Sequence, residues 1–125
     1  MTALFSIKPE YAEAILNGSK GYEYRKVIPR LGVSKIVIYA TSPKKRIIGE
    51  VDVIGCISGT PKDVWLKTKD KAGIIKFHYD KYFSRHKRAY ALQLKNPKRY
   101  ELEREIDVVV PQSFCYYQLD RSQLF

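Results

Sequence analysis

The sequence predicts an α+β fold, in which five or six strands form a small, mixed, partly closed β-barrel with flanking helices. Three observations favour this class. The chain has 125 residues, and 45% of them are apolar, which is enough for one buried core. Most of its apolar segments are short, as the strands of small barrels are. Two segments open with proline, the residue that suits the first position of a helix.

The N-terminal segments predict a strand, a helix and a second strand. Residues 3–7 form a short apolar run that suits a strand. Pro9 opens a short amphipathic helix, and Gly18 suits the position just past its end. The tyrosine-rich segment 22–27 alternates between two faces, which is typical of a strand.

The next segments predict two more strands joined by a turn. Residues 35–40 read Lys-Ile-Val-Ile-Tyr-Ala and are apolar on both faces, so we expect a central strand covered on both sides or lying inside a barrel. Residues 41–45 predict the turn. Residues 46–54 predict the second strand, with Gly49 as a bulge or a point where another backbone approaches closely.

The second half predicts a helical region followed by strands. Thr60 is a candidate cap for a helix that Pro61 opens, and helical or irregular structure continues to about Arg85. Residues 88–94 alternate well and predict a strand, which we expect Asn96-Pro97 to break. Weaker strand candidates lie at 100–106 and 114–117.

The charge of the chain favours a polyanionic partner. Lys and Arg total 23 against 13 Asp and Glu, which gives a net charge of +10. Residues 62–104 alone carry 13 basic and 5 acidic side chains, interleaved with aromatic residues. Phosphates attract such cations and bases stack on such rings, so we expect contact with nucleic acid. The alternative is a solvated cationic face over a core that uses the rings, and composition does not separate RNA from DNA.

Several classes of function are not indicated. No apolar run approaches the roughly 20 residues of a membrane span, and no signal peptide is visible. The common nucleotide, zinc-protease and hydrolase motifs are absent. His78 and His86 make a poor metal pair, and the distant Cys56 and Cys115 suggest buried thiols in a reducing compartment. We therefore expect a cytoplasmic chain without metal, cofactor or membrane partner, and nothing indicates its oligomeric state.

Charged residues near the first helix form the candidate site. Lys20 lies in a turn, and Glu23 and Arg25 follow on one face of the next strand, where residues two apart are side by side. Lys8 comes from the end of the first strand, and Glu50 would join if it lies on the same side.

Such a cluster has two chemical uses and one structural alternative. It could bind an anion or a base edge, with Arg25 as a fork and Glu23 accepting from an exocyclic amine. It could also support acid–base chemistry, because Arg25 lowers the pKa of a neighbouring lysine and a carboxylate can act as the base. The alternative is an exposed strand with a surface ion pair of little consequence.

Five segments carry a family resemblance. They read L-F-S-I-K-P-E-Y-A at 4–12, I-L-N-G-S-K at 15–20, E-Y-R-K at 23–26, I-Y-A-T-S-P at 38–43 and I-I-G-E-V at 47–51. In these segments, taken in order, the chain resembles the ASCH family of the PUA-like superfamily.

The rest of the chain fits this resemblance only in part. The segment 89–94, followed by Tyr100, is similar to the closing strands of the family. The segment between Gly59 and Lys87 matches no motif of the family. No linker or repeat interrupts the chain, so we expect residues 1–125 to form a single ASCH/PUA-like domain.

The resemblance implies a small barrel akin to RNA-binding PUA domains, with a cleft near the first helix and the E-x-R strand. That cleft would accept RNA or a nucleobase-like ligand. We expect it to be lined by Lys8, Lys20, Glu23, Arg25, Tyr39, Ser42 and Lys45.

Some small relatives in this family are enzymes, namely an amidohydrolase acting on acetylated cytidine and a ribonuclease. The resemblance implies that Lys20 and Arg25 carry over from the amidohydrolase. Glu23 stands where that enzyme has a threonine nucleophile, and a carboxylate cannot attack as a hydroxyl does. The catalytic glutamate of those enzymes comes from a later helical region that does not align here.

Three functions follow as hypotheses. The first is a nucleic-acid-binding module, RNA being favoured over DNA, associated with transcription or translation. The alternative is a small hydrolase acting on RNA or a modified nucleoside, with Lys20, Glu23 and Arg25 as catalytic residues. The third is a protein–protein module whose charge is incidental.

Overall fold

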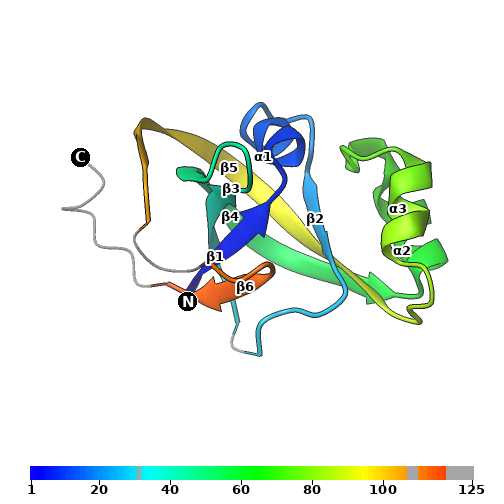
Figure 1. Ribbon diagram of the computed structural model, residues 1–125. Helices are drawn as coiled ribbons and strands as arrows, with labels where there is room; N and C mark the ends of the chain where they lie inside the picture. The colour runs from blue at the N-terminus through cyan, green and yellow to red at the C-terminus, as the bar shows by residue number, and fades with distance from the viewer. Residues whose placement is uncertain (31, 107–109, 118–125) are drawn as a thin grey trace.

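The computed structural model describes residues 1–30, 32–106 and 110–117. Strands and helices follow one another along the chain, and the three α-helices of the described residues flank one sheet (Figure 1). The elements are β1 (Thr2–Ile7), α1 (Pro9–Leu16), β2 (Tyr22–Arg25), β3 (Lys35–Ala40), β4 (Arg46–Gly59), α2 (Pro61–Thr68), the 3₁₀ turn η1 (Lys69–Lys71), α3 (Lys76–Tyr82), β5 (Ala89–Arg104) and β6 (Phe114–Tyr116).

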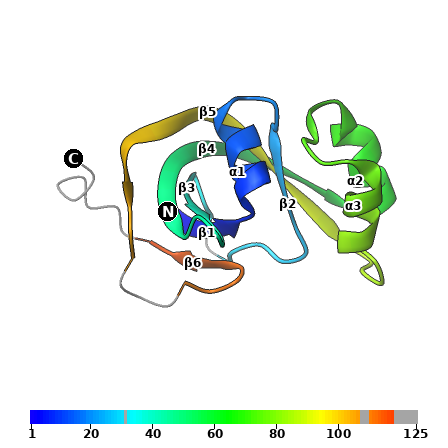
Figure 2. The ribbon, with the colours of Figure 1, turned by 45° about the horizontal axis from the view of Figure 1, so that its top comes forward.

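The strands form one six-stranded sheet in the order β2-β5-β4-β3-β1-β6. β1 and β3 run parallel, and the other neighbouring pairs are antiparallel. The long strands β4 and β5 curve around β1, β3 and α1, so that the sheet curls into a half-barrel (Figure 2). The predicted α+β class, the number of strands and the partly closed barrel are therefore confirmed.

Local signals set both predicted helix starts. Pro9 occupies the first turn of α1, and Gly18 follows the helix with φ +87°. The Thr60 hydroxyl accepts a hydrogen bond from the Asp63 backbone N–H at 3.2 Å and so caps α2.

The predicted break at Asn96-Pro97 is wrong, because β5 continues through it and joins the two expected strands into one. Asn96 takes φ +56°, and the pairing with β4 shifts register on both sides of Asp52. These bulges absorb the proline while the strand bends. A Cβ on Gly49 would lie 2.5 Å from the Lys98 carbonyl oxygen, so the predicted close approach is confirmed.

Three clusters of buried side chains divide the core. The inner core lies within the curl and against α1, the insert core lies beneath α2 and α3, and the outer core lies on the opposite face of the sheet from the inner core. On β3, Ile36 and Ile38 belong to the inner core and Val37 to the outer core, which confirms a central strand covered on both faces.

The segment between β4 and β5, residues 60–87, is called the α2–α3 insert. It packs against one end of these two strands, to one side of the curl (Figures 1 and 2). In the described part of the chain, no helix is both long and apolar enough to cross a membrane.

The expectation of two buried thiols is wrong. Cys56 is exposed because β4 runs on past the inner core, and Cys115 is half-buried because β6 is a three-residue edge strand.

Candidate functional site

Glu23 and Arg25 form a buried ion pair on one face of β2. Arg25 Nε and Nη2 donate to Glu23 Oε2 at 3.0 and 2.8 Å. The residues are 6% and 8% exposed, so the alternative of a solvated surface pair does not apply. Two charges withdrawn from water require such pairing, because either one left alone would be strongly destabilising.

Arg25 also holds the open side of the half-barrel together. Its Nη2 donates to the Ser6 carbonyl at 2.9 Å, its Nη1 donates to the Ser113 carbonyl at 3.4 Å, and its guanidinium stacks 4.6 Å from the Phe5 ring. β2 lies at one edge of the sheet and is not hydrogen-bonded to β1 as a strand. The Arg25 side chain thus connects β2 to β1, which are not paired by backbone hydrogen bonds.

Lys20, in the turn before β2, is buried as well and only 4% exposed. Its Nζ donates to the Ala72 carbonyl at 2.7 Å and lies 4.8 Å from the Tyr24 ring and 5.3 Å from the Tyr11 ring. Burial lowers the pKa of Lys20, with Glu23 opposing and Arg25 reinforcing the shift. The charges of Glu23 and Arg25 thus act on Lys20, and we call these three buried, sequence-predicted residues the Lys20 cluster (Lys20, Glu23 and Arg25).

The insert builds one wall of the Lys20 cluster. Gly73 has φ +64°, and a Cβ there would overlap the Cβ of Lys20 and lie 2.9 Å from its Cα. The Gly21 N–H donates to the Lys71 carbonyl at 2.9 Å. The α2–α3 insert, which matches no motif of the family, therefore holds Lys20, which belongs to one of the family motifs, in its position.

Three side chains around the cluster were missed by the sequence analysis. Tyr11 Oη lies 3.5 Å from His78 Nδ1, which joins α1 to α3. Burial is the main cause of the raised pKa of Tyr82, and the charges of Arg25, which lowers it, and Glu23, which raises it, also act on this phenol. The spacing of His78 and Tyr82 puts them one turn apart on one face of α3, but it does not indicate that this face lies near Lys20. In Figure 2, α1 and the insert helices lie on either side of β2.

The other predicted site residues lie outside the cluster. Lys8, Ser42 and Lys45 are exposed, and the 41–45 turn lies beside the start of α1 because the Thr41 N–H donates to the Ile7 carbonyl at 2.9 Å. Tyr39 packs against the outer core, on the opposite face of the sheet from Glu23. Within the described residues, no hydrogen bond or ion pair joins these four residues to the Lys20 cluster.

Glu50 does not join the cluster, because its neighbour Val51 faces the inner core and Glu50 faces the outer one. It forms an ion pair with Lys35 and accepts a hydrogen bond from Tyr100 Oη at 3.0 Å. Burial alone would raise the pKa of Glu50, but the hydrogen bonds from Lys35 and Tyr100 outweigh it and lower the pKa.

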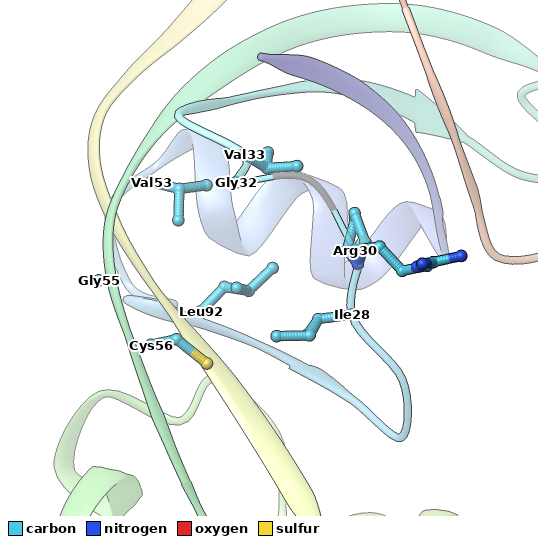
Figure 3. Close-up of a pocket in the computed structure, with 9 residues that line it drawn as sticks. Ile28, Arg30, Gly32, Val33, Val53, Gly55, Cys56 and Leu92 are labelled. Carbon is cyan, nitrogen blue, oxygen red and sulfur yellow. The ribbon is translucent and has the colours of Figure 1, made fainter.

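Figure 3 shows residues that line a pocket of about 340 Å³, and none of the three residues of the Lys20 cluster belongs to its lining. Leu92, which pairs with Glu23 across the sheet, lines it together with Cys56 and with described residues of 28–30 and 32–33. Its lining is mainly apolar, and it includes none of the sequence-predicted site residues. In the part of the chain that the structure describes, no group of three His, Cys, Asp or Glu residues could hold a metal ion.

A family model, a curated relative and a solved structure all relate this chain to the same family. The family model for the ASCH domain matches residues 5–110. The ASCH domain-containing ribonuclease of Zymomonas mobilis is 34% identical over 95 residues, which are 75% of this chain and 64% of the relative. The crystal structure of ASCH from Zymomonas mobilis superposes with a TM-score of 0.88 at 27% identity, covering 98% of this chain and 91% of that one.

Other curated relatives come from Ureaplasma parvum. The large ribosomal subunit protein uL22 is 27% identical over 106 residues, and the ATP synthase subunit alpha is 28% identical over the same length. These matches cover 84% of this chain but 34% and 13% of the two relatives. The chain thus spans less than two thirds of the length of the curated relatives it matches.

Proposed function

The chain belongs to the ASCH domain family, and from this premise we propose that it binds RNA at the Lys20 cluster. The observation that carries the proposal is a buried lysine held beside a buried carboxylate–guanidinium pair, in a chain of net charge +10. Buried and fixed charges recognise polar groups with little loss of side-chain entropy, and the surrounding excess of cations attracts phosphates.

The hydrogen bonds of Glu23 support a role for its carboxylate in recognising a nucleobase. Both hydrogen bonds from Arg25 go to Glu23 Oε2. Within the described residues, every fully buried side-chain oxygen or nitrogen has a hydrogen-bond partner, whereas no bond involves Glu23 Oε1. That oxygen therefore retains contact with solvent and can accept from an exocyclic amine of a base. Arg25 uses four of its five N–H groups in these contacts and keeps one Nη1 hydrogen for a ligand.

Binding is tested with a fluorescent single-stranded RNA at increasing salt. We expect affinity to fall steeply with salt, because each neutralised phosphate releases counterions. Lys20→Met should weaken binding at every salt concentration, while Lys98→Met, on the exposed part of β5, serves as the matched control. Affinity that is independent of salt, or equal loss in both variants, contradicts the proposal.

A second candidate function, RNA cleavage, is favoured by the 34% identity to a protein described as an ASCH domain-containing ribonuclease. In this reaction Glu23 would take the proton of the attacking oxygen as the new P–O bond forms. Lys20, whose pKa is lowered by burial, would give a proton to the oxygen that leaves as the old P–O bond breaks. Arg25 would stabilise the charge that develops on the phosphoryl oxygens.

Cleavage is tested by incubating end-labelled RNA, and separately acetylated cytidine, with the wild type, Lys20→Met and Glu23→Gln. Turnover that both variants abolish supports a hydrolase at this site. Turnover that survives Lys20→Met undiminished excludes this site, and intact RNA with retained binding leaves the binding function alone.

A further inference from the structure

The aromatic residues of the insert fall into two groups that the sequence could not separate. Tyr79 and Phe83 are 1% and 3% exposed and form the insert core with Tyr24. Phe77 is 70% exposed and Tyr82 is 37% exposed. A single exposed apolar side chain is common on protein surfaces and does not by itself indicate a function. Evidence that Phe77 binds a ligand must therefore come from the residues around it.

Phe77 stands at the end of a series of rings that leads to the Lys20 cluster. The centroids of the Phe77 and His78 rings are 5.8 Å apart. His78 Nδ1 lies 3.5 Å from Tyr11 Oη, and the Tyr11 ring lies 5.3 Å from Lys20 Nζ. An RNA strand that reaches Lys20 would therefore lie beside a series of exposed or half-buried rings that ends at Phe77.

The insert also carries the positive charge that a bound RNA strand requires. Residues 60–87 hold eight Lys and Arg side chains against three Asp and Glu. Of these carboxylates, Asp80 is bound to Lys76 at 2.6 Å, which reduces its repulsion of a phosphate. All eight cations are exposed, so they can follow a phosphate backbone while a base lies flat on a ring.

From these observations we infer that the α2–α3 insert carries a base-stacking site for single-stranded RNA, centred on the Phe77 ring and continuous with the Lys20 cluster. The inference rests on the proposed RNA binding and extends it, because it predicts a preference for unpaired bases and assigns that preference to the insert. Exposed rings accept any base, so the site adds affinity for single strands without selecting a sequence.

The test compares Phe77→Ala with Leu102→Ala, which removes a similarly exposed apolar side chain (64% against 70%) from β5. We expect Phe77→Ala to weaken binding of a single-stranded RNA by roughly tenfold, and Leu102→Ala to leave it unchanged. Phe77→Trp should retain the affinity of the wild type. The salt dependence should be the same in Phe77→Ala as in the wild type, because stacking releases no counterions.

A second measurement separates stacking from mere contact. RNA carrying 2-aminopurine should be quenched on binding to the wild type and not to Phe77→Ala, and abasic RNA should bind both proteins equally. Equal RNA affinity of Phe77→Ala and the wild type overturns the stacking site and leaves the binding function standing. A wild type that binds no RNA overturns both. Self-association lost in Phe77→Ala, with RNA affinity unchanged, assigns the ring to contact between copies of the chain instead.

Discussion

The motif region, residues 1–59, and the α2–α3 insert use charge in opposite ways. In the motif region Glu23, Arg25 and Glu50 are buried and each is bound by a specific partner. In the insert every charged side chain is exposed, and the surface is strongly basic. The buried charged side chains of the motif region are therefore held in fixed positions by their partners, whereas the charged side chains of the insert give its surface a positive potential that attracts phosphates.

Replacing Arg25 by Met tests the first half of this comparison and should have the largest effect. The change leaves the Glu23 carboxylate buried without its partner and removes the bonds to Ser6 and Ser113. We expect the free energy of unfolding to fall by about 3–5 kcal/mol, measured by urea denaturation. The exposed Arg88, replaced in the same way, should change it by less than about 0.5 kcal/mol. Similar losses at both positions would remove the distinction between buried and exposed charge.

Alkaline pH probes Tyr24, a motif residue whose ring lies in the insert core. Burial raises the pKa of Tyr24 from 10.0 to about 12, so between these values the folded state holds a proton that the unfolded state has lost. Stability is therefore complete below pH 10 and falls as the pH rises towards 12, by about 2–3 kcal/mol from this group.

Tyr24→Phe should flatten this decline in denaturation curves recorded across the alkaline range. It should also cost about 1 kcal/mol at neutral pH, because the hydrogen bond to Thr68 is lost. The difference between the two curves reports Tyr24 together with its effect on Tyr79, because the Tyr24 charge is a secondary cause, after burial, of the raised pKa of Tyr79. Parallel curves would show that the insert core does not shield this phenol.

Gly73→Ala tests whether the insert fixes Lys20. The new methyl group would overlap Lys20 on a backbone with φ +64°, so we expect a loss of about 1–2 kcal/mol together with weaker RNA binding. Gly32→Ala is the matched control, because a Cβ there meets nothing within 4 Å. Unchanged stability and binding in Gly73→Ala would detach the insert from the cluster.

Asp80→Asn should have the smallest effect on stability, about 0.5 kcal/mol or less, because the exposed pair with Lys76 is an i,i+4 pair on a helix. Removing one negative charge from the basic surface should nevertheless raise RNA affinity at low salt. Thermal denaturation and RNA titration of the same sample check both effects. A large loss of stability would mean that the charges of the insert are structural after all.

Local chemistry explains which parts of the fold the sequence could predict. The strand 35–40 and the helix starts at Pro9 and Pro61 were predicted at the positions observed, because alternation, capping and proline act within a few residues. The continuity of β5 was not predicted, because the bulge around Asn96 depends on pairing with the distant strand β4. The face of Glu50 and the exposure of Cys56 likewise depend on where the core ends.

The same distinction between local and distant contacts explains which parts of the candidate site could be predicted from the sequence. Glu23 and Arg25 were expected side by side because residues two apart on a strand share a face. The burial of Lys20 was not expected, since its partner Ala72 is 52 residues away in a segment without motifs. His78 and Tyr82 were missed because only the packing of α3 brings them to the cluster.

The contact between Arg25 and Ser6 has a consequence for the order of folding. It joins residues only 19 apart, whereas β2 finds its backbone partner in β5, much later in the chain. Closing a short loop costs less conformational entropy than closing a long one. We therefore expect β1, α1 and β2 to assemble first as a local nucleus, around which the later strands wind.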